Sequence, residues 1–205
     1  MLKHVTPEEA QWMVEEAQAG DVSQQLTLAK IFLEEPRSEM QVNQVVLWLQ
    51  PAIAKGNIEA LGLAGAEAYE YKEFKDAFEW FRKAGAQGGA YGQFMVATMY
   101  TRGEGVPQNY ELATDWAIQS AEQGFAPAQA LMGLCFSNGW GVPQDKSTAY
   151  LWLALASANE PSFIDWRDEV AEVLTKEQID FAQKKALDWE HNRTQSQITL
   201  EGTQQ

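Results

Sequence analysis

Large apolar side chains recur along this chain at a nearly constant interval, and helix-length segments of mixed polarity lie between them. The clearest markers are tryptophans that follow one another after 36, 32, 36 and 36 residues, with a glycine eight positions after each of the first four. A period of this length is typical of proteins whose repeating unit is a pair of helices. The tryptophans are Trp12, Trp48, Trp80, Trp116 and Trp152, and the glycines are Gly20, Gly56, Gly88 and Gly124.

These tryptophans mark one packing face of a helix. The positions three before and four after each later tryptophan carry small or modest side chains, and positions at this spacing share a helical face. A large ring between small side chains lets a neighbouring helix approach closely, so we expect most of the rings to lie in a packed interior. Glu9 and Glu16 instead flank Trp12, as expected for an end helix that faces water on one side. The small pairs are Val45/Ala52, Ala77/Ala84, Ala113/Ser120 and Ala149/Ala156.

Two copies of the repeat align without a gap. Residues 95–109 read MVATMYTRGEGVPQN and residues 131–145 read LMGLCFSNGWGVPQD. The pattern predicts a first helix over about 88–102 and a second over about 109–123. Gly103 and Gly105 allow the left-handed conformations that end the first helix, and Pro107 prevents its continuation. Asn109, and Asp145 in the next copy, are suited to cap the second helix.

The repeats predict an all-α fold, a right-handed α-solenoid of helix-turn-helix units without a sheet. We expect a single solenoid domain over residues 1–191, with an N-terminal cap helix at 7–20, four helical pairs at 21–159 and C-terminal capping helices at 161–191. The last two helices are expected at 162–174 and from the capping box at Thr175 to about His191. Residues 192–205 are polar and aperiodic, and we expect a flexible tail there.

The repeats resemble the Sel-one-like repeat family, α-solenoids related to tetratricopeptide repeats. The resemblance covers about residues 7–190, is specific in the third and fourth units, and implies a scaffold or adaptor that recognises a protein or peptide. The stretch LTKEQIDFAQKKALDW also looks like the closing helix of bacterial members. The residues that carry the resemblance are Gly92, Val96, Ala97, Tyr100, Gly103, Gly105, Val106, Pro107, Asn109, Ala113, Trp116 and Gly124, and then Ala128, Met132, Gly133, Phe136, Gly139, Gly141, Val142, Pro143, Asp145, Ala149 and Trp152.

Net charge and cysteine content limit the kind of partner and the cellular compartment that we expect. The formal net charge is −14, which disfavours nucleic acid and anionic membranes and favours a basic or neutral protein partner. Solubility alone explains the acidity equally well. The single cysteine, Cys135, excludes a disulfide within the chain, and no apolar stretch has the length of a signal peptide or a membrane span. We therefore expect a cytoplasmic protein.

No constellation of residues predicts catalysis, a cofactor or a metal. His4 and His191 lie near opposite ends of the sequence without ligand-spaced companions. The Gly-x-Gly pairs follow helices and lack a third glycine, so they are not dinucleotide fingerprints. Cys135 sits in an apolar run and is interpreted as a core residue. We expect a binding protein and no enzyme. The alternative is a bacterial immunity or inhibitor protein that occludes a toxic effector.

The binding surface is predicted on the first helix of each repeat, which lines the concave side of a helical-pair solenoid. Positions between the core positions of these helices would form a partly apolar stripe suited to a peptide or helix of a partner. Trp140 lies at a loop tip, where it is either an exposed hot spot or folded back on the C-terminal helices. The candidate partner-binding residues are Met95, Thr98, Thr101, Arg102, Leu131, Leu134, Ser137, Asn138 and Trp140.

Overall fold

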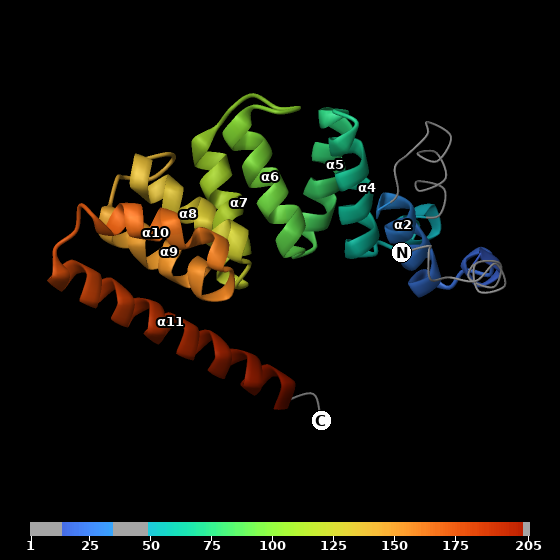
Figure 1. Cartoon of the computed structure of the whole chain (residues 1–205). Helices are drawn as coiled ribbons and strands as arrows, with labels where there is room; N and C mark the ends of the chain where they lie inside the picture. The colour runs from blue at the N-terminus through green and yellow to red at the C-terminus, as the bar shows by residue number, and fades with distance from the viewer. Residues whose placement is uncertain (1–13, 35–48, 203–205) are drawn as a thin grey trace. The chain divides into compact units, whose positions relative to one another are not determined.

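A computed structural model of the chain describes residues 14–34 and 49–202 and the side chains of residues 14–30 and 49–195. Within these ranges every regular element is a helix, as Figure 1 shows, and inside each of two units neighbouring helices pack against one another. The prediction of an all-α solenoid is confirmed. The elements are α2 (Val22–Glu34), α4 (Ile58–Glu70), α5 (Phe74–Ala86), α6 (Ala90–Arg102), α7 (Tyr110–Glu122), α8 (Ala126–Asn138), α9 (Lys146–Asn159), the 3-10 helix η2 (Pro161–Phe163), α10 (Ile164–Ala171) and α11 (Lys176–Gly202).

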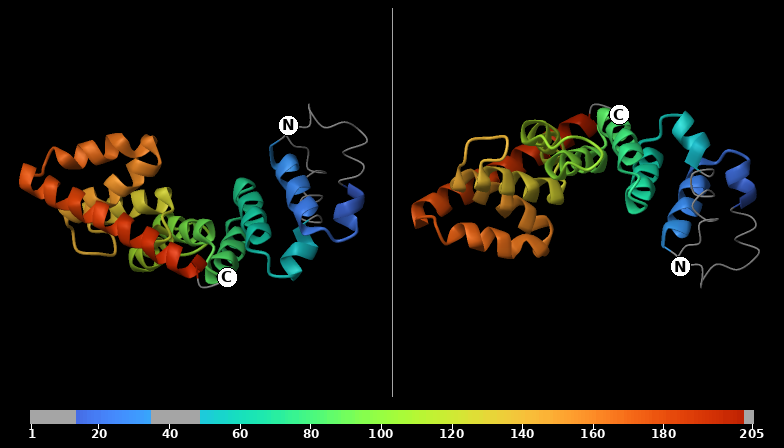
Figure 2. Two further views of the ribbon diagram at one scale, coloured as in Figure 1. Left: turned by 90° about the horizontal axis from the view of Figure 1, so that it is seen from below. Right: turned by 90° about the horizontal axis from the view of Figure 1, so that it is seen from above.

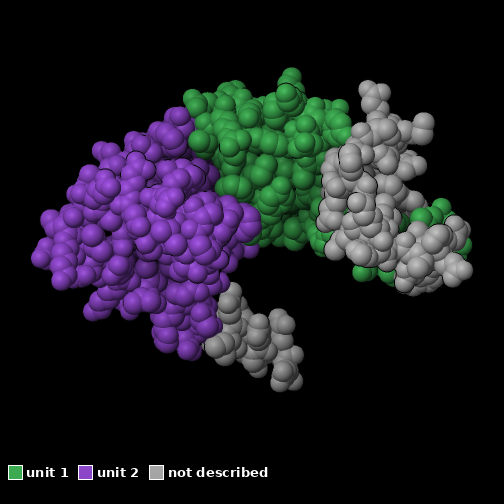
Figure 3. All heavy atoms as spheres, viewed as in Figure 1, with its two compact units in different colours: residues 1–108 green, residues 109–205 purple. Residues whose placement is uncertain are grey.

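The helices group into two compact units, residues 1–108 and 109–205, coloured separately in Figure 3. The division falls in the glycine–proline loop that follows α6, and the single solenoid domain over residues 1–191 stays a prediction. The predicted N-terminal cap helix at 7–20 and the first helical pair lie partly outside the described residues.

In the first unit, α2 packs on α4, α4 on α5, and α5 on α6. Alanines provide much of the contact between helices, and Ala60, Ala64, Ala77 and Ala84 are all buried. Phe81 is completely buried beneath them, and a β-carbon at Gly65 would lie 2.7 Å from its ring. Small side chains on α4 thus let the large ring of α5 enter the space between the two helices.

In the second unit, α7 packs on α8 and α8 on α9, and α9 also contacts α10 and α11. Leu153 of α9 lies at the centre and is fully buried. A β-carbon at Gly133 would lie 2.5 Å from the Leu153 Cγ. As in the first unit, a small residue on one helix makes room for a large side chain of the next, and α8 packs closely against α9. The left view of Figure 2 shows α11 as one continuous helix.

The predicted helix ends are confirmed in the two best copies. Gly103 and Gly139 adopt the left-handed conformation directly after α6 and α8, with φ of 71° and 74°. The side chain of Asn109 accepts a hydrogen bond from the Leu112 amide at 3.0 Å, and Asp145 accepts one from the Ser147 amide at 2.9 Å. Both are N-caps, so the loop between paired helices closes by the expected turn chemistry.

The prediction that most tryptophan rings lie in the interior is wrong for the described residues. Among the six tryptophans there, only Trp152 is buried, at 8% exposed. Trp80 and Trp116 occupy the same repeat position and are half-buried, although their small neighbours are fully buried as predicted. The alanine face makes the helix–helix contact, and the rings cover its edge with one side toward solvent.

The last helix runs farther than the sequence predicted. We expected an end near His191 and a flexible tail at 192–205, but α11 continues to Gly202. Arg193 lies in this extension, and its guanidinium donates to the Gln123 carbonyl at the end of α7 and to Glu190 at 2.5 Å. A residue of the expected tail therefore caps the C-terminus of another helix.

Candidate functional site

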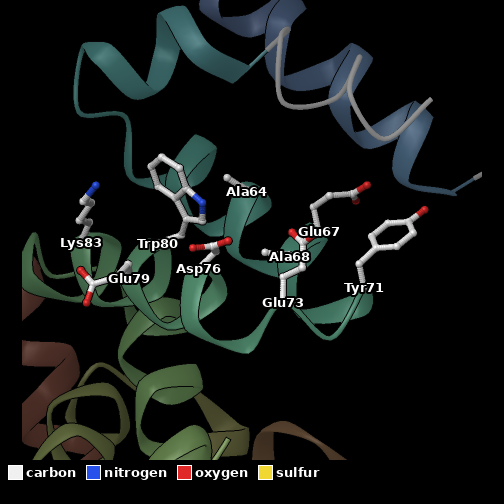
Figure 4. Close-up of a pocket in the computed structure, with 9 residues that line it drawn as sticks. All are labelled: Ala64, Glu67, Ala68, Tyr71, Glu73, Asp76, Glu79, Trp80 and Lys83. Atoms are coloured by element: carbon white, nitrogen blue, oxygen red, sulfur yellow. The ribbon is translucent and has the colours of Figure 1, made fainter. Parts of the chain in front are cut away.

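An acidic pocket of about 390 Å³ opens on α4 and α5 of the first unit. Figure 4 shows side chains from both helices and from the turn between them directed into it. We call it the acidic pocket. The lining residues are Ala64, Glu67, Ala68, Tyr71, Glu73, Asp76, Glu79, Trp80 and Lys83.

Helical spacing explains why these side chains converge. On α4 the positions 64, 67 and 68 share a face, and on α5 the positions 76, 79, 80 and 83 do so. The alanines Ala64 and Ala68 leave space that larger side chains would fill. The turn between the helices is short, and Lys72 closes it with a φ of 61° where other repeats use glycine. The short turn places Glu73 at the start of α5, beside the pocket.

The pocket combines negative charge with an aromatic wall. Glu67 lines it although only 2% of this residue is exposed, and Glu73, Asp76 and Glu79 add three exposed carboxylates. Trp80 supplies the wall, and the Lys83 ammonium lies 4.6 Å from the centre of its ring. The face of this tryptophan therefore accepts a cation.

A second cation modifies the rim of the acidic pocket. The Arg82 guanidinium donates a hydrogen bond of 2.7 Å to Glu79 and lowers the pKa of that carboxyl. Glu79 is thus ionised at neutral pH, and part of its charge is compensated by its neighbour in the same helix. Glu73 and Asp76 remain the exposed carboxylates of the pocket best suited to an external cation.

A groove of about 370 Å³ lies between α8, the start of α9 and α10 in the second unit. We call it the α10 groove. Val170 forms part of its floor and is buried, whereas Trp166 of α10 and Val173 in the turn after α10 are 41% and 67% exposed. The lining residues are Leu134, Ser137, Asn138, Lys146, Leu153, Trp166, Glu169, Val170, Glu172 and Val173.

Three of the predicted binding residues line the α10 groove: Leu134, Ser137 and Asn138. Ser137 also accepts a hydrogen bond of 2.8 Å from the Lys146 ammonium. Leu131 was expected on the same stripe but is buried, because α8 is enclosed on more than one side and shows no simple apolar face.

Trp140 lies outside both concavities, in neither of the two arrangements that the sequence predicted. Its ring is half-buried and stacks on Tyr110 of α7, with ring centres 5.3 Å apart and an angle of 13° between the planes. The ring thereby covers the loop that follows α8.

The predicted residues of α6 belong to the first unit and line neither of the two concavities. Met95 is buried, and the hydroxyls of Thr98 and Thr101 donate to carbonyls of their own helix at 2.9 Å. Arg102 is exposed and donates to the Tyr69 hydroxyl at 3.0 Å, which itself donates to Glu104 at 2.5 Å. Burial and the hydrogen bond to Glu104 raise the pKa of Tyr69, so its proton is held in this network.

The acidic pocket was missed at the sequence level because Trp80 was interpreted as a core marker. A usable signal was present on α5, where Asp76, Glu79 and Trp80 follow at helical spacing beside the alanines of the preceding helix.

The described residues were also compared with the requirements of metal binding, cysteine chemistry and membrane insertion. They contain no group of three or more histidine, cysteine, aspartate or glutamate side chains arranged to hold a metal. Burial raises the pKa of the Cys135 thiol to about 11, so this cysteine is protonated and unreactive at neutral pH. Within the same part of the chain, no helix has both the length and the apolar character of a membrane span.

Comparison with known proteins finds matches to the Sel1 repeat at residues 65–89, 90–125 and 126–160. Among solved structures, the chain is similar to a protective antigen of uropathogenic Escherichia coli that displays an SLR fold, with 27% identity and a TM-score of 0.81. That similarity covers 90% of this chain but only 41% of the antigen. A Sel1 repeat protein from Oxalobacter formigenes shares the fold, with 20% identity and a TM-score of 0.71 over 87% of this chain and 74% of that one. No curated protein sequence matches.

Proposed function

Because the chain belongs to the Sel1-like repeat family, we propose that it is a scaffold that binds a basic partner protein, and that its acidic pocket receives a lysine or arginine side chain of that partner. Sel1 repeats generally mediate binding between proteins. The proposal that the partner is basic rests on one observation: Trp80 and four carboxylates line a single pocket.

The pocket suits a cationic side chain for two physical reasons. A tryptophan face attracts a cation through the negative potential of its ring, by about 0.5–2 kcal/mol depending on desolvation. The carboxylates of Glu73 and Asp76 lie around the same space and can accept charge-assisted hydrogen bonds from an ammonium or guanidinium. Lys83 already lies over the ring, and the lining carboxylates outnumber it.

The charge of the whole chain supports the same partner. With a net charge of −14, the surface accelerates encounter with a basic protein and slows encounter with an acidic one. This long-range effect depends on ionic strength, whereas contacts inside the pocket are screened less.

A displayed library of random peptides tests the proposal and does not require that the partner be identified first. Wild-type protein is expected to enrich peptides that contain lysine or arginine, and the Glu73→Gln/Asp76→Asn double variant is expected to lose that enrichment. The matched control is Glu111→Gln/Asp115→Asn, which neutralises two exposed carboxylates of α7 outside the pocket. Enrichment without basic residues, or equal enrichment by all three proteins, would show that the pocket does not select a cation.

The inhibitor alternative makes the same demand on charge, since an effector with a basic active-site cleft would also meet the acidic pocket. Under this alternative the partner is an enzyme, and its turnover stops when one equivalent of this protein has been added. Turnover of the captured partner therefore distinguishes the two functions.

A further inference from the structure

We propose that the α10 groove docks an amphipathic basic helix of a partner, with one apolar side chain inserted between Leu134 and α10. This inference rests on the proposed function as an interaction scaffold and adds a second site of different chemistry. The acidic pocket takes one charged side chain, whereas the α10 groove takes an apolar anchor that basic residues flank.

Apolar side chains of α10 and of the turn after it line one side of the groove. Trp166 and Val170 lie one turn apart on the same face of α10, and Val173 follows in the turn after the helix; all three line the groove. Val170 is buried as the floor, but 41% of Trp166 and 67% of Val173 are exposed. Phe163 contacts the Trp166 ring, with ring centres 5.5 Å apart, and so holds it in place beside the groove. A pre-positioned aromatic ring beside an apolar floor is typical of an interface anchor site.

The opposite wall is built from helices α8 and α9. Leu134 is half-buried there, Leu153 lies beneath it, and Asn138 stands exposed at the end of α8. A groove with a helix on each side and an apolar floor accommodates a partner helix through residues spaced by three or four positions.

Charge decides which helix fits. Between residues 160 and 173 five carboxylates stand against a single guanidinium, that of Arg167, which pairs with Asp168 at 2.7 Å. Glu169 and Glu172 line the groove itself. The Lys146 ammonium lies on the other wall and donates to Ser137. The α10 rim is therefore negative and favours lysine or arginine beside the apolar anchor. A second copy of this chain is disfavoured because both copies carry a charge of −14.

The test uses three synthetic helical peptides of equal length. The first combines a leucine stripe with lysines, the second combines the same stripe with glutamates, and the third carries lysines but no apolar stripe. Binding of each is measured by fluorescence anisotropy against wild type, Val173→Gln and Leu187→Gln. Leu187 is the matched control, because it is 73% exposed on α11 and lies outside the groove. Both replaced side chains are exposed, so both variants are expected to fold, which circular dichroism verifies.

The leucine–lysine peptide is expected to bind wild type and Leu187→Gln equally, and Val173→Gln about tenfold more weakly, since an apolar contact is removed. The other two peptides are expected to bind weakly to all three proteins. Equal binding of the leucine–lysine peptide to all three proteins, or no binding to any, overturns the proposal. Equal binding of the glutamate peptide overturns the charge argument.

A fourth protein separates this inference from the proposed function. In the Glu73→Gln/Asp76→Asn variant the α10 groove is intact, so the leucine–lysine peptide is expected to keep most of its affinity. If affinity is lost in that variant and retained in Val173→Gln, the peptide binds the acidic pocket. The groove proposal then fails while the proposed function stands.

Discussion

Gly141 lies directly against the backbone carbonyl of Tyr110, so close that a β-carbon at position 141 would be 2.6 Å from that carbonyl carbon. The equivalent Gly105 meets the carbonyl carbon of Phe74 at the same 2.6 Å. In each unit, the loop after one helix thus packs on the first turn of an earlier helix. The second glycine of each Gly-x-Gly pair is required by this contact as well as by its left-handed φ.

Replacing Gly141 with alanine is therefore expected to be costly. The substitution combines backbone strain of about 1 kcal/mol with a steric clash of about 1–3 kcal/mol against a carbonyl that cannot move away. Urea unfolding measures the loss of stability. Gly88→Ala is the control, because Gly88 has a φ of 87° but no atom within 4 Å of the added β-carbon. Equal midpoint shifts for the two variants would mean that the contact with Tyr110 contributes nothing.

Two tryptophans at the same repeat position are expected to contribute differently to the free energy of unfolding. Trp152 is 8% exposed and contacts Trp189 with ring centres 6.0 Å apart, whereas Trp116 is half-buried. Trp152→Ala should lower the free energy of unfolding by about 3–5 kcal/mol, as for other buried large rings, and Trp116→Ala by clearly less. Chemical denaturation of both variants checks the order. A larger loss for Trp116→Ala would contradict the burial described above.

The two N-caps are expected to respond differently to pH. Hydrogen bonds from Thr148, followed by those from backbone amides, lower the pKa of the Asp145 carboxyl. Its folded-state pKa is below the unfolded value, so its stabilisation is present at neutral pH and is lost as the pH falls through the folded pKa, in the acid range below about 4. Asp145→Ala should cost about 0.5–2 kcal/mol at pH 7 and much less below pH 3.

Asn109 supplies the uncharged comparison for this prediction, since it caps α7 at the equivalent position. Asn109→Ala should have a cost that does not change over the same pH range. Stability curves of both variants against wild type measure the difference. A pH-independent cost for Asp145→Ala would show that its carboxylate charge is immaterial to the cap.

Arg193 is expected to protect the end of α11. A β-carbon at Gly124 would lie 2.8 Å from its guanidinium, which also contacts the Trp189 ring at 5.5 Å. Arg193→Gln should lower the free energy of local opening at residues 196–202 by about 1 kcal/mol, read as faster amide hydrogen exchange. Arg167→Gln, which removes a guanidinium from an ion pair within α10, should leave this exchange unchanged. Unchanged exchange in Arg193→Gln would contradict this protective role.

Local patterns were sufficient to predict the helices, their caps and the small residues between them. Gly103, Asn109 and Ala113 act within one or two helical turns, and the sequence carries all the information that such contacts need. The contact of Arg193 with Gln123 was not predictable in this way, because it spans 70 residues.

Buried glutamines make further contacts that local sequence patterns do not predict. Gln93 and Gln129 each donate to a carbonyl eight residues earlier, at 3.1 and 3.3 Å, and so connect the start of one helix to the end of the preceding one. Gln25 does the same with Ala17 at 2.9 Å. In the sequence a polar residue on a helix indicates a solvent-exposed face, and only the packing of successive helices shows that these three are in the core.

The candidate site was predictable in part. Leu134, Ser137 and Asn138 line the α10 groove because they lie on the side of α8 that α10 covers, and the sequence placed them on a shared stripe. Trp140 was misjudged because its partner, Tyr110, lies 30 positions earlier in the sequence. The acidic pocket depends on how α4 and α5 meet, which repeat spacing alone does not determine.

A double-mutant cycle on the acidic pocket tests the central claim most directly. One peptide from the selection is prepared with its key basic residue as lysine and as uncharged norleucine, and each form is titrated calorimetrically into wild type and Glu73→Gln/Asp76→Asn. The account predicts that norleucine weakens binding to wild type and has little effect on the variant, with a coupling free energy of about 1–3 kcal/mol. A coupling of zero, with lysine favoured equally by both proteins, would contradict the claim that this pocket receives the cation.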